Sequence, residues 1–155
     1  AKILHQFNHP TSTKQYNYPS AWTTPVYGCK AQLEKPPDES TPLSTSDTKT
    51  LQQINSSLLY YARAVDPTML LSVGDIASYQ SCPTINTSKA LTHLLNYAAT
   101  HTHAILRYHA SDMILHTHSD ASYLTAPKSR SRAGGYFFYG IYQPLFHPSQ
   151  WTNTL

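Results

Sequence analysis

The fold class is decided by the β-prone stretch Met113-Ile114-Leu115-His116-Thr117-His118-Ser119-Asp120, which follows a change from helical to strand-like patterning after His101. Another β-prone run, 104–108, comes before it, and we expect residues 109–112 to form a hairpin turn between the two. A bulky aromatic run, 136–139, follows Gly134-Gly135. The sequence therefore predicts antiparallel strands over about 104–109, 113–121 and 135–141.

Upstream of these runs, apolar residues recur at spacings of three and four, which places them on one face of successive helices. Asp66-Pro67 supplies an N-cap and a proline at the first helical position, and Thr84 or Asn86 can cap a later helix. We expect three helices, packed together, between about Thr48 and Thr100. The residues expected on inner faces are Leu58, Ile76, Leu91, Leu94, Leu95 and Leu115.

The region before the helices is rich in Pro, Thr, Ser and Tyr and has no sustained period. We therefore expect an α+β chain with three parts. Residues 1–47 form an extended connector, residues 48–103 form a three-helix unit, and residues 104–155 form a β region.

Composition permits a polyanionic partner without requiring one, because the net charge is only +3 and charged residues make up 12% of the 155 residues. No apolar run approaches the roughly 18 to 20 residues that cross a bilayer, so we expect no membrane partner and an intracellular location, cytoplasmic or nuclear. Cys29 and Cys82 form no Cys-x-x-Cys pair, so reduced thiols are expected.

Four segments in fixed order carry a family resemblance. They are Leu-Leu-Tyr-Tyr-Ala-Arg-Ala-Val-Asp-Pro-Thr-Met-Leu (58–70), Leu-Leu-Asn-Tyr (94–97), His-Ser-Asp-Ala-Ser-Tyr (118–123) and Lys-Ser-Arg-Ser-Arg-Ala-Gly-Gly-Tyr-Phe-Phe (128–138). Together they resemble copia-type LTR retrotransposon polyproteins, from the connection region at the end of the reverse transcriptase to the N-terminal part of the ribonuclease H domain. The resemblance covers about residues 50–140, and residues 1–49 match only loosely.

The resemblance implies that residues 104–155 are an incomplete ribonuclease H-like sheet and that Asp120 is the first catalytic, metal-binding carboxylate. The complete domain cleaves the RNA strand of RNA–DNA hybrids with two Mg²⁺ ions, which need carboxylates from several elements. Here only Asp112 lies close upstream, no acidic residue follows Asp120, and the family's other carboxylates would fall beyond Leu155. We therefore expect Mg²⁺ only in a complete domain, none bound to this chain alone, and no cleavage by it.

Three cations, Lys128, Arg130 and Arg132, lie where we expect a loop between two strands, and they are candidates for phosphate contacts. The expected partners are an RNA–DNA hybrid or another nucleic acid, bound weakly, and the rest of the polyprotein. Solvated loop charges are an equally ordinary interpretation.

Other interpretations remain open at this point. His116, His118 and Asp120 share a strand face and could bind zinc with His101 or His103, although a solvent-facing histidine row is the more ordinary explanation and His101 and His103 also suit a helix C-terminus. The chain could also be a domesticated or relic non-enzymatic module that binds another protein. A reading frame that continues past Leu155 with a third strand would favour the enzyme fragment, and a stop codon would favour the module.

Overall fold

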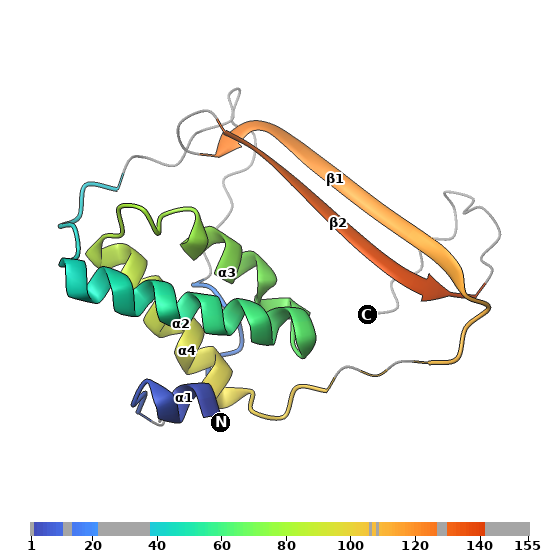
Figure 1. Ribbon diagram of the computed structural model, residues 1–155, viewed down its shortest axis with the longest axis horizontal. Helices are drawn as coiled ribbons and strands as arrows, with labels where there is room; N and C mark the ends of the chain where they lie inside the picture. Colours follow the sequence, from blue (N-terminus) through green and yellow to red (C-terminus); the bar gives the residue numbers. More distant parts are fainter. Residues whose placement is uncertain are drawn as a thin grey trace. The chain divides into compact units, whose positions relative to one another are not determined.

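The computed structural model combines helices with one pair of antiparallel strands (Figure 1), which confirms the α+β class. The chain divides into two compact units, a helical one and one that contains the strands, and each is described by itself. The residues that the structure describes are 2–10, 14–21, 38–105, 107, 109–126 and 130–141.

The helical unit contains α1 (Lys2–Gln6), α2 (Thr45–Ala64), α3 (Leu70–Ala77) and α4 (Ile85–Thr100), with a 3₁₀ turn η1 (Pro67–Met69) before α3. Helices α2, α3 and α4 occupy the part of the chain where the apolar period predicts three helices, and they pack together (Figure 1). Helix α1 has no counterpart among the expectations from the sequence, because five residues are too few to show a helical period.

Side-chain caps fix where these helices begin. Ser44 accepts the backbone N–H of Asp47 at 3.1 Å at the start of α2. Asp66 caps η1 by accepting the backbone N–H of Thr68, with Pro67 at the next position, as the sequence predicts. Thr84 caps α4 in a reciprocal arrangement with Thr87, which decides between the two expected caps.

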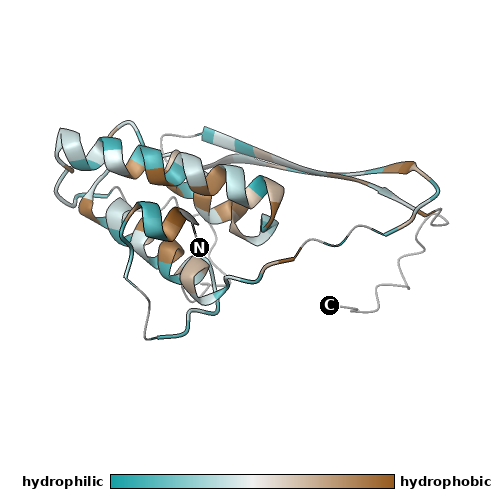
Figure 2. Ribbon diagram, turned by 60° about the horizontal axis from the view of Figure 1, so that its bottom comes forward, coloured by the Kyte–Doolittle hydropathy of each residue, from teal (hydrophilic) through white to brown (hydrophobic). Residues whose placement is uncertain are grey.

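The core of this unit is a cluster of apolar side chains from α2, η1, α3 and α4. Figure 2 shows apolar and polar residues following one another around each helix, as an amphipathic pattern requires. Five of the residues expected on inner faces are buried, which confirms the helical phase. The buried apolar residues are Leu51, Ile54, Leu58, Ala62, Met69, Val73, Ile76, Leu91, Leu94, Leu95 and Tyr97.

Hydrogen bonds from three histidines connect the N-terminal segment to α4. The Nε2 atom of His9 lies 2.9 Å from Oδ1 of Asn96, and Nε2 of His93 lies 3.0 Å from the carbonyl oxygen of Tyr18. His101 is the C-cap residue of α4, as expected, and its Nε2 lies 2.8 Å from the carbonyl oxygen of Tyr16. Each nitrogen faces an oxygen acceptor, so each carries the proton and donates.

The second unit contains β1 (Ile114–Ala126) and β2 (Arg130–Gly140), paired antiparallel from Ile114 opposite Gly140 to Ala126 opposite Arg130, with an irregularity between Ser122 and Ala126. The expected strand over 104–109 is wrong for the part of it that the structure describes, which contains no strand residue. β propensity alone forms no strand where no partner pairs with the segment.

The β2 strand begins at Arg130, earlier than the expected start near residue 135, because Arg132, Ala133 and Gly134 continue the ladder opposite Ser122, Ala121 and Asp120. The expectation that Arg130 and Arg132 lie in a loop is therefore wrong. Leu115 was expected on an inner face but is 58% exposed, since both faces of the strand pair are open around it.

Candidate nucleic-acid interface

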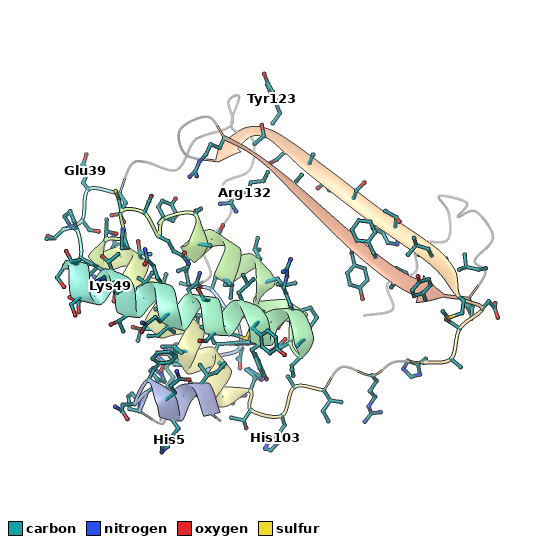
Figure 3. The ribbon with its side chains drawn as sticks, viewed as in Figure 1. His5, Glu39, Lys49, His103, Tyr123 and Arg132 are labelled. Atoms are coloured by element: carbon teal, nitrogen blue, oxygen red, sulfur yellow. The ribbon has the colours of Figure 1, made fainter. Side chains whose placement is uncertain are left out.

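The strand pair has two distinct faces, because successive side chains of a strand point to opposite sides. Register places Asp120 opposite Gly134, His118 opposite Tyr136 and His116 opposite Phe138, so these residues share one face. Figure 3 shows that Arg132 and Tyr123 point to opposite sides of the pair, which agrees with this assignment. We call the side that carries His116 the His–aromatic face. It is formed by His116, His118, Asp120 and Ser122 of β1 and by Arg130, Arg132, Gly134, Tyr136 and Phe138 of β2.

Four rings are layered along one end of this face. The Phe138 ring stacks on both His116 and His118, with centroid distances of 5.0 and 5.7 Å and interplanar angles of 12° and 8°. The centroid of the Tyr136 ring lies 5.3 Å from that of Phe138, and the two ring planes are inclined at 38°. The row therefore presents a continuous π surface made from both strands.

The position of His116 is fixed from two directions. Its Nε2 donates to the carbonyl oxygen of Ile141 at 3.0 Å. Its ring also lies across Gly140, where an added Cβ would come within 2.9 Å of the imidazole. Glycine at position 140 is thus what allows the ring to lie flat over the strand and stack on Phe138.

Asp120 lies beyond the rings, near the middle of β1. Its side chain is exposed, and Oδ1 accepts the backbone N–H of Ala121 at 2.8 Å. Its partner across the ladder is Gly134, where an added Cβ would meet no atom within 4 Å. The carboxylate therefore faces an open position on the neighbouring strand and keeps its second oxygen as an acceptor.

The cations occupy the other end of the same face. Arg130 and Arg132 are both exposed on β2, two residues apart, and so project to the same side as Tyr136 and Phe138. Lys128, the third expected phosphate-binding residue, lies outside the described residues. The structure thus places two of the three expected cations on the face that carries Asp120.

No group of three His, Cys, Asp or Glu side chains within the described residues is close enough to hold an ion, whereas two Mg²⁺ ions need several carboxylates and zinc needs three or four ligands. The expected zinc row also has other contacts, since His116 and His118 stack on Phe138. His101 belongs to the helical unit, where its ring packs 4.5 Å from Tyr97.

The opposite face of the strand pair is apolar at one end. Leu115, Phe137 and Tyr139 alternate with the residues of the His–aromatic face, and all three are exposed. The ring of Phe137 lies over Gly135, where an added Cβ would come within 2.9 Å of it. This side offers apolar contact area, and none of the strand residues described on it is charged.

The layered rings are the feature that sequence reasoning missed. Their signal is present as His116-x-His118 on one strand and Tyr136-x-Phe138 on the other, each at the spacing of a single strand face. Recognising the stack required the register between the strands, which sequence spacing alone does not supply.

Protein-family models, curated proteins and solved structures offer no match for the chain. Among the helices that the structure describes, none is both long and apolar enough to cross a membrane. What the His–aromatic face binds has to follow from its own chemistry and from the motifs that build it.

Proposed function

We propose that the chain is a segment of a copia-type retrotransposon polyprotein, in which the strand pair contacts nucleic acid and Asp120 is one carboxylate of a ribonuclease H site. The observation that carries the proposal is the pairing of the two motif-bearing segments. Residues 118–122 lie antiparallel to residues 132–136, with Asp120 opposite Gly134. Motifs that are separate in the sequence thereby meet on one surface.

The charges of this surface support contact with a phosphate backbone. Arg130 and Arg132 project from one strand face at the spacing of alternate residues, and guanidinium groups bind phosphate oxygens through several hydrogen bonds. Contacts of this kind position a nucleic acid without reading its sequence, and they weaken as salt rises. The interaction we propose with an RNA–DNA hybrid is therefore weak, salt-sensitive and independent of sequence.

Cleavage by this chain alone is not part of the proposal. Asp120 is an exposed carboxylate, and the described residues bring no second and third acidic ligand to it. A two-ion site requires carboxylates on more than one element to hold both ions in a fixed geometry. In the proposed function other parts of the polyprotein supply those groups.

The proposal predicts how binding to a labelled RNA–DNA hybrid responds to salt. Each phosphate contact contributes about −0.9 to the slope of log binding constant against log salt on a duplex. Replacing both Arg130 and Arg132 with Ala should therefore make the slope shallower by up to about 2. Fluorescence anisotropy titrations at several salt concentrations measure it.

A matched control removes the same charge elsewhere. Lys49 and Lys89 are exposed on α2 and α4, and the double change of both to Ala should leave the slope as it is in the unaltered chain. Equal slopes for the Arg double variant and the unaltered chain would contradict the proposal and favour a protein partner.

A second function, a non-enzymatic module that binds another protein, is supported by a separate observation. Tyr60 on α2 and Leu71 on α3 are 79% and 69% exposed, so both side chains are accessible to a partner. Changing both to Ser separates the two functions, because hybrid binding by the strand pair should not depend on them. Loss of hybrid binding in that variant, with the helical circular dichroism retained, would count against the strand pair as the binding surface.

A further inference from the structure

The ring layers on the His–aromatic face follow the spacing of the strand. Residues two apart on a strand are separated by roughly 7 Å, about twice the thickness of an aromatic ring, so one ring fits between two others. Phe138 stacks on both His116 and His118, which are two residues apart. The face therefore offers stacking surfaces for flat groups.

The next interval along β2 has no side chain. Beyond Phe138 and Tyr136 the face continues with Gly134 and then Arg132, and the space above Gly134 is open to at least 4 Å from the Cβ position. Tyr136, 60% exposed, borders this position on one side. Arg132 borders it on the other, and Asp120 lies directly across the ladder. We call it the Gly134 position.

We propose that the Gly134 position binds an unpaired base of a single-stranded nucleic acid, stacked on Tyr136, with an amino group directed to Asp120 and the adjoining phosphates near Arg130 and Arg132. The inference rests on the proposed function for the choice of nucleic acid as the partner. It goes further by naming the strand state and the atoms that would be recognised. It concerns this chain without a metal ion, because an Asp120 that held a metal in a complete ribonuclease H site would not be available to a base.

Each neighbour of the Gly134 position matches one part of a nucleotide. The Tyr136 ring offers a π surface on which any base can stack, as aromatic residues do in proteins that bind single strands. Asp120 is acceptor-only when ionised, and one of its oxygens already accepts the N–H of Ala121. The other oxygen suits the amino group of cytosine, adenine or guanine, which thymine and uracil lack.

The charges along the face match the polarity of a nucleotide. Arg130 and Arg132 lie on the side of Gly134 away from the rings. The phosphates adjoining a base bound at Gly134 would therefore lie near the two guanidinium groups. A paired base would have the same amino group engaged with its complement. The arrangement therefore favours single strands over duplexes.

The test fills the Gly134 position and leaves every charge in place. Gly134 does not have the positive φ that only glycine tolerates, and valine suits a strand, so Gly134→Val should fold with the same register. The matched control, Ala133→Val, adds similar bulk one residue away on the opposite face. Circular dichroism verifies both folds before binding is measured.

Binding is measured by anisotropy with two labelled single strands of equal length and charge, one bearing cytosines and one abasic throughout. The unaltered chain and Ala133→Val should prefer the cytosine strand about tenfold, the contribution of roughly one stacked base. Gly134→Val should bind both strands equally. A retained preference in Gly134→Val, or no preference in the unaltered chain, would overturn the inference.

A second comparison tests the role of Asp120. The unaltered chain should bind an oligocytidine more tightly than an oligothymidine, and Asp120→Ala should lose that difference, because the thymine edge lacks the amino donor. Equal binding of both by the unaltered chain would remove Asp120 from the inference.

The outcomes separate this inference from the proposed function. Hybrid binding with an arginine-dependent salt slope but no preference for bases would contradict base binding at the Gly134 position and leave the proposed function standing. Failure to bind any hybrid or single strand would overturn both and would leave a protein as the partner of the face.

Discussion

Asp38 shows how one exposed residue organises the start of a helix. Its carboxylate accepts hydrogen bonds from the Thr84 hydroxyl, from the Asn86 side chain at 2.9 Å, and from Ser40 through both its hydroxyl and its backbone N–H. These contacts, led by the one from Thr84, lower the pKa of Asp38 to about 2. A negative charge at this end also suits the helix dipole of α4.

The depressed pKa predicts an acid-sensitive stability of the helical unit. The folded pKa lies below the unfolded value of 3.8, so the stabilisation is complete above that pH and is lost as pH falls toward about 2. Asp38→Asn should therefore flatten the pH dependence of the thermal midpoint in this window. The effect should be small, because solvent screens an exposed carboxylate.

Thermal melts followed by circular dichroism between pH 2 and pH 6 give this measurement, with about one pH unit per step. The neighbouring exposed carboxylate provides the control, and Glu39→Gln should keep the pH dependence of the unaltered chain. If both variants behaved alike, the contact between Asp38 and α4 would not be the source of the effect.

Some residues could be assigned from the sequence and others could not. Asp66 was predicted as a cap, and Thr84 as one of two candidates, because a cap acts on its own local chain. Asp38 could not be predicted, because its partners lie 46 and 48 positions away and depend on tertiary folding. The same holds for the layered rings, which combine two strands.

At the level of elements, packing of α2 against α3 leaves two buried side-chain oxygens without a hydrogen-bond partner among the described residues. Asn55 donates to the carbonyl oxygen of Val73 at 3.3 Å, but its own Oδ1 finds no partner among the described residues. The Ser72 hydroxyl, 4% exposed, likewise has none there. A buried polar atom without a hydrogen bond costs about 1 to 3 kcal/mol.

We therefore predict that Ser72→Ala stabilises the helical unit by about 1 kcal/mol, because it removes the unsatisfied hydroxyl and leaves a small side chain in place. Urea unfolding followed by helical circular dichroism gives the change in free energy of unfolding. Ser56→Ala, at an exposed position of α2, reports the gain from helix propensity alone and should be smaller. Destabilisation by Ser72→Ala would show that the hydroxyl has a partner in solution.

The elements differ in how well sequence predicts them. Helices α2, α3 and α4 were predicted because their apolar period is local and their caps are explicit. The strand expected over 104–109 and the late start of β2 were wrong, because pairing decides a strand. Arg130, Arg132, Ala133 and Gly134 pair with β1 despite low β propensity. Asp120 was correctly placed on a strand, while its arginine neighbours were not.

On the scale of the whole molecule, the two units are stabilised very differently. The helical unit has a buried core, whereas no described side chain of the strand pair is buried. Isolated two-stranded hairpins are marginal in water and gain stability from a surface that covers one face. In the proposed function, the rest of the ribonuclease H domain covers the apolar side of the strand pair, where Leu115, Phe137 and Tyr139 lie. The His–aromatic face then stays open.

The most direct test of the proposed function is a cleavage assay on an RNA–DNA hybrid with magnesium. It compares this chain with a fusion that adds the C-terminal half of a copia-type ribonuclease H domain, which supplies the further carboxylates. We predict no cleavage by the chain alone and cleavage of the RNA strand by the fusion, abolished by Asp120→Asn. Cleavage by the chain alone that is lost on Asp120→Asn, or fusion activity that ignores this substitution, would contradict the account.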